Sequence, residues 1–326
     1  MILAGDIGGT KTNLAYCELR GGRLACNDIE SHPSKEHASL AEIVKKYVSE
    51  HDEEITAAAF GIAGPVIDGR CEATNLPWVV DAREIAALLD IETVGLVNDL
   101  EATAYGTLRL GKEDQFVLNE GTPLDHGSIG VIAAGTGLGE GGLVWNGSRY
   151  QALPSEGGHS DFAPRNKLEM ELLQFLLQRH ERVSWERVLS GPGLYALYEF
   201  FRARSEYPEP HWLKQEIDSG DPSAVVSRAG LERKDSASVE ALETFVSLYG
   251  SEAGNLALTL LSTGGLYIAG GIAPKILAMI QQGSFLRSFV NKGRLSDLLT
   301  TMPVAVVLND KTALYGAAHV ALMMND

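Results

Sequence analysis

The stretch Ile2-Leu3-Ala4-Gly5-Asp6-Ile7-Gly8-Gly9-Thr10-Lys11 decides the fold expected for the first part of the chain. Its apolar start, Ile2 to Ala4, predicts a strand, and Leu14 to Leu19 predicts a second strand after the turn. The adjacent glycines Gly8-Gly9 allow the tight turn between the two. The chain is therefore expected to begin with a strand, a glycine-rich turn and a strand.

The same arrangement recurs in the middle of the chain. Ile129 to Ala133 predicts a strand, Gly135 to Gly139 a turn and Gly142 to Trp145 a second strand. Helices alternate with buried strands after the first hairpin, as at Ala57 to Ile62 and Val94 to Val97. Two adjacent strands followed by strand–helix units favour a mixed sheet covered by helices. The repetition predicts two similar α/β halves with a cleft between them.

Helices are predicted from apolar periodicity and from capping residues. Ser39 with Glu42 marks one helix start, and Asp81 with Glu84 marks another. We interpret the polar stretch Ser205 to Asp235 as helices and loops of the globular part. The other predicted elements are the helices Ser39 to Glu50, Glu101 to Leu108, Leu168 to Arg179, Val239 to Leu261 and one ending near Met323, and the strands Leu266 to Ile268 and Val304 to Leu308.

Composition excludes several classes of protein. The 326 residues exceed the ~250–300 at which a single core stops growing, so two domains are expected. A net charge of −16, from 27 Lys and Arg against 43 Asp and Glu, argues against nucleic acid or an anionic membrane as partner. The apolar runs are far shorter than the ~20 residues that span a bilayer. Asp6 and Lys11 interrupt the start, so no signal peptide is expected.

The cysteines indicate the cellular compartment. Cys17, Cys26 and Cys71 form an odd set without a CxxC pair. We therefore expect free thiols, no zinc site and a reducing compartment. Together with the absence of a signal peptide, this predicts a cytoplasmic protein.

The first candidate site is the turn itself, from Gly5 through Ile7, Gly8 and Gly9 to Lys11. Its glycines let the backbone approach a phosphate, Thr10 adds a hydroxyl group and Lys11 adds a cation. Asp6 is placed to hold Mg²⁺ through water beside the phosphates. The turn is neither a Walker loop nor a dinucleotide fingerprint, and a plain hairpin with an exposed aspartate is the alternative.

Two further glycine clusters are candidates for nucleotide binding. Gly135-Thr136-Gly137-Leu138-Gly139 could cradle a second phosphate, with a flexible turn as the alternative. Gly270-Gly271 follows a buried strand and would leave room for a flat ring such as adenine. A pair of packing glycines is the alternative there.

Asn98 and Asp99 follow a buried strand, at the edge where open α/β sheets bind ligands. A carboxylate at this place can accept a proton from a substrate hydroxyl as a general base. Aspartate is also a preferred helix N-cap, and both roles can hold in part.

Three polar side chains of the second half are candidates for binding hydroxyl groups. Glu156 and His159 flank Gly157-Gly158, which disfavours a helix, so both are expected on a loop. A carboxylate and an imidazole together can hydrogen-bond vicinal hydroxyls, whereas a lone histidine makes a metal site improbable. Glu186 is expected just inside a helix start capped by Ser184, where the helix dipole alone would favour an acid.

Taken together, these segments resemble the bacterial glucokinases, in the group that lacks the structural zinc. The resemblance covers nearly the whole chain, and its most specific parts are the runs Leu153 to Pro164 and Glu186 to Gly193. The other matching segments are Gly5 to Thr10, Gly61 to Val66, Thr74-Asn75, Val97 to Asp99, Gly135 to Gly139 and Ala269 to Ile272.

The resemblance implies two ribonuclease-H-like α/β domains of the actin and hexokinase type, with residues 1–108 and 310–326 in one and 109–309 in the other. It implies ATP-dependent phosphorylation of D-glucose at the 6-hydroxyl, with Mg²⁺, by a homodimer that feeds glycolysis. Asp99 would be the base. The sugar would be bound by Asn75, Asn98, Asp99, Glu156, His159 and Glu186, and the nucleotide by Gly5 to Lys11, by Gly135, Thr136 and Gly137, and by Gly270 and Gly271.

Two other functions stay open at this point. The chain could phosphorylate another hexose, such as mannose or an amino sugar, which differ from glucose at the 2-position. It could also be a sugar sensor without catalysis, but Asp6 and Asp99 are both present and the charge of −16 opposes DNA binding. With the first turn starting at Gly5, we expect no helix-turn-helix ahead of it.

Overall fold

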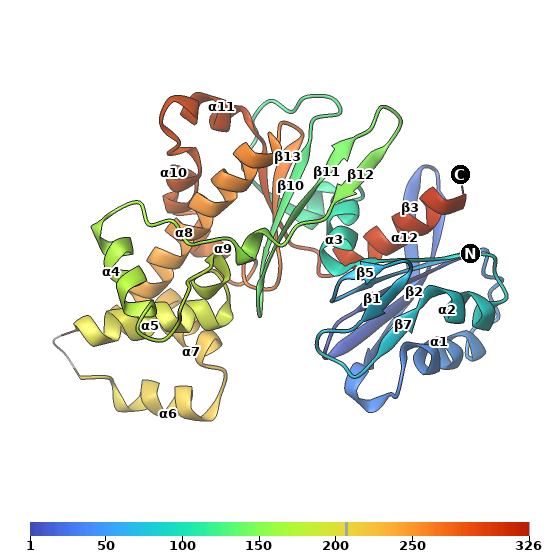
Figure 1. Ribbon diagram of the computed structural model, residues 1–326, viewed down its shortest axis with the longest axis horizontal. Helices are drawn as coiled ribbons and strands as arrows, with labels where there is room; N and C mark the ends of the chain where they lie inside the picture. The colour runs from blue at the N-terminus through green and yellow to red at the C-terminus, as the bar shows by residue number, and fades with distance from the viewer. Residues whose placement is uncertain (206–207, 326) are drawn as a thin grey trace. The chain divides into compact units, whose positions relative to one another are not determined.

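The computed structural model describes residues 1–205 and 208–325, which form two compact units (Figure 1). The units are Met1–Gln115 with Ala152–Pro154 and Asn309–Asp326, and Phe116–Gln151 with Ser155–Leu308. The first unit extends past residue 108 because Asn309 holds Asp114, with Nδ2 donating to Oδ1 at 2.8 Å. The domain limits expected at 108 and 310 stay a prediction.

The first unit is built on a mixed sheet in the order β3-β2-β1-β4-β8. β1 is antiparallel to β2 and parallel to β4, which is parallel to β8. This is the expected hairpin followed by strand–helix units. The strands are β1 (Ile2–Ile7), β2 (Lys11–Arg20), β3 (Arg23–Pro33), β4 (Ala57–Ile62) and β8 (Val94–Asn98), and a small separate sheet contains β5 (Val66–Ile67), β6 (Arg70–Glu72) and β7 (Val79–Asp81).

Helices cover both faces of this sheet (Figure 1). On one face lie α1 (Leu40–Ser49) and α2 (Ala82–Leu89), and on the other α3 (Asp99–Thr107) and the terminal α12 (Thr312–Asn325). α1 and α2 begin as predicted, because Ser39 accepts a hydrogen bond from the Glu42 N–H and Asp81 accepts one from the Arg83 N–H. α12 packs on α3, β1 and β4, so the end of the chain completes the first unit.

The second unit repeats the plan of the first. Its sheet has the order β12-β11-β10-β13-β14-β9, with β10 antiparallel to β11 and parallel to β13, and β13 parallel to β14. The repetition expected from the two hairpins is confirmed. The strands are β9 (Gln115–Asn119), β10 (Ile129–Ala134), β11 (Leu138–Trp145), β12 (Tyr150–Leu153), β13 (Gly265–Ala269) and β14 (Val304–Val307).

The long helix α8 (Ser236–Leu260) is the centre of the second unit's core. Phe245 and Tyr249 are fully buried along it. The Tyr249 hydroxyl accepts from the Ala134 N–H at 3.2 Å and donates to the Ala269 carbonyl at 3.3 Å, which ties α8 to β10 and β13. The other helices are α4 (Lys167–Leu176), α5 (Gly191–Arg204), α6 (His211–Ser219), α7 (Pro222–Leu231), α9 (Leu277–Ile280), α10 (Ser284–Val290) and α11 (Ser296–Thr301).

The polar stretch expected to hold helices and loops contains α6 and α7. Residues 206 and 207 of that stretch lie outside the described residues. None of the helices in the described residues combines the length and the apolar character that crossing a membrane requires.

The expectation of three free thiols is wrong. Cys17 on β2 lies opposite Cys26 on β3, and the two form a disulfide. Only Cys71 is free among the described cysteines, and it is buried. The cysteines therefore no longer support a reducing compartment.

Candidate functional site

The carboxyl ends of three parallel strands bring the first candidate residues to one edge of the first sheet. In the register of β1, β4 and β8, Ile7 pairs with Ile62 and Ile62 pairs with Asn98. Asp6 is thus one residue from the end of β1, and Asp99 directly follows β8. This is the edge at which open α/β sheets bind ligands.

The capping role considered for Asp99 belongs to Asn98. The Asn98 Oδ1 accepts from the Leu100 N–H at 2.9 Å, and its Nδ2 donates to the Gly64 carbonyl at 3.1 Å. Asp99 is the first residue of α3, and its Oδ1 also accepts from the Leu100 N–H at 2.9 Å. Asn98 is therefore the N-cap of α3, and the Asp99 carboxylate shares the bond to the Leu100 N–H.

Ser34 holds the Gly8–Lys11 turn. Its Oγ donates to the Gly8 carbonyl at 2.8 Å, and its N–H donates to the Thr10 carbonyl at 3.0 Å. The Gly8 N–H is used inside the turn, where it donates to the Lys11 carbonyl at 2.9 Å. Asn75 reaches this turn, since a Cβ on Gly9 would lie 2.6 Å from the Asn75 Cβ. The turn and Asn75 thus form one surface.

Two residues of the expected phosphate loop belong to the core instead. Gly5 is buried inside β1, and a Cβ there would overlap the ring of Phe60. Ile7 is also buried. Their place in β1, between β2 and β4, supports the turn by packing.

Asp6 is half-buried and stands in an acidic neighbourhood. Burial raises the pKa of Asp6 to about 6, and the nearby Asp99 carboxylate raises this pKa further. The Asn13 Nδ2 donates to the Asp6 Oδ2 at 3.3 Å and, with the Lys311 charge, acts in the opposite direction. A carboxylate that is costly to ionise becomes easier to ionise beside a cation.

The residues fit a magnesium ion held mainly through water. Mg²⁺ commonly keeps several waters and is bound by one or two carboxylates together with substrate phosphates. No group of three or more His, Cys, Asp or Glu suited to a metal occurs within residues 1–205 and 208–325, so a full cage of protein ligands is not formed there. Asp6 supplies one such carboxylate at the ligand edge of the sheet.

In the second unit, Glu186 lies against the glycine loop between β10 and β11. The Leu138 N–H donates to the Glu186 Oε2 at 3.1 Å. A Cβ on Gly137 would lie 2.5 Å from the same oxygen. The Gly191 N–H donates to the Gly135 carbonyl at 2.8 Å, so the segment after Glu186 also holds this loop.

The expectation that Ser184 caps the helix at Glu186 is wrong. Glu186 lies in a single 3-10 turn, Trp185–Arg187, and the Ser184 side chain makes no capping hydrogen bond. Ser184 pairs instead with Asp161 in a β-bridge, which fixes an extended backbone there. The following helix α5 is capped by Ser190, whose Oγ accepts from the Gly193 N–H at 3.1 Å.

Glu156 directly precedes a short 3-10 turn, Gly157–His159, and His159 is the last residue of that turn. Both side chains belong to exposed residues. The Trp185 N–H donates to the Ser160 carbonyl at 3.0 Å, which joins the turn to the Glu186 segment. The structure therefore brings Glu156, His159 and Glu186 to one place.

A cavity of about 1090 Å³ adjoins the glycine loop. Gly135 and Thr136 line one side, and Gly271 lines another. Gly137 lies against Glu186, and Gly270 packs with φ +83° against the Ala134 backbone. Of the five glycine-cluster residues predicted for nucleotide binding, three line the cavity and two support it.

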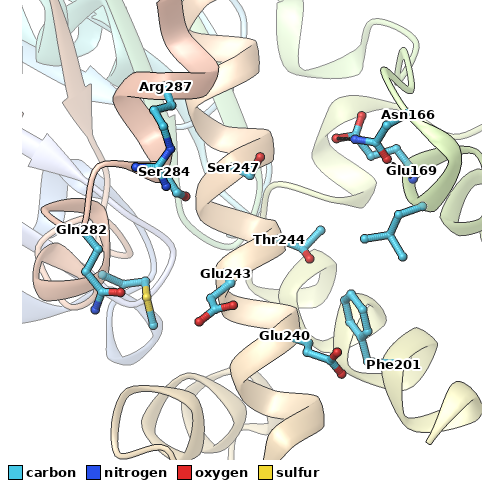
Figure 2. A pocket seen from close by; sticks show the side chains of 12 residues that line it. Asn166, Glu169, Phe201, Glu240, Glu243, Thr244, Ser247, Gln282, Ser284 and Arg287 are labelled. Atoms are coloured by element: carbon cyan, nitrogen blue, oxygen red, sulfur yellow. Dashed lines mark hydrogen bonds between the residues drawn. The ribbon is translucent and has the colours of Figure 1, made fainter. Parts of the chain in front are cut away.

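A second hollow, of about 520 Å³, lies among α4, α5, α8 and α10 (Figure 2). Glu169, Glu243 and Arg287 are among its polar side chains. None of the residues predicted to bind substrate lines it, so it is separate from the site described above.

Comparison with known proteins identifies the family. The family model described as Glucokinase matches residues 3–324. A glucokinase of Nostoc punctiforme is 45% identical over 333 residues, covering 98% of each chain, and one of Synechocystis sp. is 43% identical, covering 97% of this chain and 96% of its own. The chain belongs to the glucokinase family.

Solved structures agree with this family. The crystal structure of a glucokinase from an Antarctic psychrotroph has a TM-score of 0.88 at 30% identity and covers 100% of this chain and 99% of its own. A ROK family glucokinase from Streptomyces griseus, solved in complex with glucose and AMPPNP, shares the fold at a TM-score of 0.66 and 21% identity, over 99% of each chain. The two actin-like α/β units that the resemblance implied are confirmed, and this glucokinase family member is a hexose kinase.

Several lining residues of the glucokinase cavity escaped the sequence analysis. They come from α5, from α7 and its cap, and from the segment before α9. Asp221-Pro222-Ser223 is a recognisable helix start, and Asp221 does accept from the Ser223 N–H at 2.9 Å. That signal locates a helix but not the face of the sheet on which the helix lies. The residues missed in this way include Tyr195, Asp221, Ser223, Arg228 and Lys275.

Replacing Gly270 with alanine is expected to disturb the backbone around the cavity and so to weaken nucleotide binding. The left-handed φ of +83° disfavours a side chain, and a Cβ would overlap the Ala134 backbone beside the glycine loop. We expect a destabilisation of about 1–3 kcal/mol and a rise in the KM for nucleotide. Thermal melting and steady-state kinetics measure both. The matched control is Gly271→Ala, where a Cβ meets nothing within 4 Å and melting should be unchanged.

Proposed function

We propose that this protein transfers the γ-phosphoryl group of ATP to the 6-hydroxyl of D-glucose. The observation that carries the proposal is the position of Glu186, whose carboxylate accepts a hydrogen bond from the Leu138 N–H of the glycine loop. The Trp185–Arg187 segment thereby joins the loop that adjoins the cavity to the turn that carries Glu156 and His159, through the Glu186 carboxylate on one side and the Trp185 N–H on the other. A polar hydroxyl-binding group next to a phosphate-sized loop suits a sugar and a nucleotide bound side by side.

The chemistry asks little covalent work of the protein. Phosphoryl transfer is catalysed by positioning and by charge stabilisation, with one group to take the hydroxyl proton. Asp99 is proposed to take that proton, since it directly follows β8 at the edge of the sheet where ligands bind. Asp6 would hold Mg²⁺ through water, and the ion neutralises charge on the phosphates when it is bound.

The proposed nucleotide site is the cavity lined by Gly135, Thr136 and Gly271. The glycine loop would hold phosphates through backbone N–H groups, and Thr136 adds a hydroxyl donor. Arg228 and Lys275 line the same cavity and supply positive charge in a chain of net charge −16. We propose the Gly8–Lys11 turn, with Thr10 and Lys11, as a second phosphate contact.

We propose Glu156, His159 and Glu186 as sugar-binding residues of the second unit, and Asn75, Asn98 and Asp99 as sugar-binding residues of the first unit. Several paired polar groups are needed because each sugar hydroxyl requires a partner once it is removed from water. A site built in this way rejects analogues that leave one of its groups unpaired.

A panel of sugars tests the proposal. With Mg·ATP, we expect glucose to be phosphorylated with a kcat/KM at least ~10-fold above that for mannose, fructose or N-acetylglucosamine, because the site pairs specific hydroxyls. Coupled assays of sugar phosphate formation measure this. A higher kcat/KM for mannose or an amino sugar would favour the kinase of another hexose. Glucose binding without turnover of any sugar would favour the sensor.

We also propose a cytoplasmic homodimer that supplies glucose 6-phosphate to glycolysis. ATP as phosphoryl donor supports the cytoplasm, whereas the Cys17–Cys26 disulfide does not. Light scattering of the purified protein would measure the subunit number. Thiol labelling of protein taken directly from reducing cells would show whether the disulfide is closed there.

A further inference from the structure

Two buried glutamates of the second unit have no part in the chemistry described so far. Glu140 lies on β11 and Glu252 on α8, and each is about 4% exposed. Their carboxyl groups are hydrogen-bonded to each other. Burial raises the pKa of both, and the nearby Glu252 carboxylate raises the pKa of Glu140 further. Buried charges are costly unless they are paired, so the two carboxyls share one proton at neutral pH.

The surrounding charges decide which glutamate holds the proton. The Asn255 Nδ2 donates to the Glu252 Oε2 at 2.7 Å, and the Lys292 ammonium bonds the Asn255 Oδ1 and donates to the Ser251 carbonyl at 2.9 Å. Both the amide and the Lys292 charge favour an ionised Glu252. Glu140 therefore carries the proton, and its O–H donates a hydrogen bond to the Glu252 carboxylate.

The Glu140 side chain packs directly against the Glu156–His159 turn. A Cβ on Gly157 would overlap the Glu140 Oε2, and a Cβ on Gly158 would overlap the Leu138 carbonyl. The turn therefore lies in direct contact with β11, above Leu138 and Glu140. The Glu140 Oε1 is buried and has no hydrogen-bond partner among the described residues, so no second interaction fixes this carboxyl.

We propose that Glu140, through its hydrogen-bonded pair with Glu252, is a positioning residue that sets the Glu156–His159 turn for sugar binding. This inference rests on the proposed role of Glu156 and His159 in the sugar site. Loss of the shared proton would place two carboxylates together in a buried space. Their repulsion would displace the Glu140 side chain and with it the turn that rests on it. Sugar affinity then falls at alkaline pH, while the nucleotide cavity is affected less.

Other titratable groups face the pair and must be separated from it. Lys292 has its pKa lowered to about 8 by burial, so its charge is lost over the same alkaline range. Tyr249 from α8 lies close to Glu140 and stays uncharged, because burial raises its pKa. Arg165 from the segment before α4 adds positive charge near Lys292, and Glu156 and His159 lie on the adjacent turn. A variant at Glu140 leaves all of these groups in place.

The test is the pH dependence of the two KM values from pH ~6.5 to ~9.5. In the unmodified enzyme we expect the KM for glucose to rise at least ~5-fold over the alkaline part, with the KM for ATP and kcat changed less than ~2-fold. In Glu140→Gln the amide still donates to Glu252 and cannot ionise, so the glucose KM should stay near its neutral value throughout. Glu140→Ala should raise the glucose KM ~10-fold even at neutral pH.

Glu169→Gln is the matched control. Glu169 is an equally buried glutamate of the same unit, but its Oε1 accepts from the Asn166 Nδ2 at 2.9 Å and from Arg165, at the hollow shown in Figure 2. This variant should keep the alkaline rise of the glucose KM. A flat glucose KM in the unmodified enzyme, or an unaltered rise in Glu140→Gln, overturns the inference. His159→Ala tests the sugar site separately, since an unchanged glucose KM there would remove the proposed site itself.

Discussion

Replacing Asp99 with asparagine is expected to lower kcat by about 10²–10⁴, the usual contribution of a positioned general base. Asparagine keeps an Oδ1 that can accept the Leu100 N–H, so the start of α3 should be undisturbed. Asn98 continues to cap the helix in the variant. The loss is therefore chemical, and glucose binding measured by calorimetry should change by less than ~5-fold. Asp99→Ala should abolish turnover in the same way.

Asn98→Ala is the control for this experiment. It removes the Oδ1 cap and the hydrogen bond to the Gly64 carbonyl, which should cost about 1 kcal/mol or more in stability. The base stays in place, so turnover at saturating glucose should fall far less than in Asp99→Asn. Activity of Asp99→Asn within ~10-fold of the unmodified enzyme would contradict the assignment of the base.

Local sequence signals were sufficient to predict the two hairpins and the starts of two helices. The turns at Gly8-Gly9 and at Gly135 to Gly139 predicted two hairpins, and each became the antiparallel part of a mixed sheet. Capping residues located α1 and α2, because a cap depends only on neighbours in the sequence. The fit of whole motifs to the glucokinases then supplied the family of the fold, which no local signal contains.

The disulfide follows from the register that a short glycine turn imposes on β2 and β3. Gly21 and Gly22 both have positive φ, +56° and +80°, and they form a two-residue turn between Arg20 and Arg23. Cys17 and Cys26 are the fourth pair counted from that turn. The sequence analysis did not assign β3, so the count was not made and the thiols were expected to be free.

Parts of the site depend on contacts that sequence spacing cannot express. Glu186 was expected in a helix, yet the bridge between Ser184 and Asp161 fixes an extended segment before it. Likewise, nothing in the spacing of Glu140 and Glu252 indicates that a strand and a helix bring them together beneath Gly157. Such contacts arise only when the sheet and α8 have packed.

Replacing Asp6 with asparagine is expected to remove activity and to stabilise the protein at neutral pH. The folded state raises the pKa of Asp6 from 3.8 to about 6, because the carboxyl is buried beside Asp99. Between these pH values the folded state binds more protons than the unfolded state, so stability falls as pH rises through this range. Above pH ~6 the full cost is present, on the order of 2–3 kcal/mol. Asparagine carries no such cost.

We therefore expect Asp6→Asn to raise the melting temperature by a few degrees at pH ~7.5, and to have little effect at pH ~4, where the carboxyl is protonated in the folded state. Catalysis should fall at least ~100-fold, since the carboxylate proposed to hold Mg²⁺ through water is gone. In the unmodified enzyme, kcat/KM, which reports ionisation of the free enzyme, should decline as pH falls through about 6. Asp310→Asn is the control, because Asp310 is exposed, adds charge near Asp6 and pairs with Lys311 at the surface. An unchanged or lower melting temperature of Asp6→Asn at pH ~7.5 would contradict the expected cost of ionising Asp6 in the folded protein.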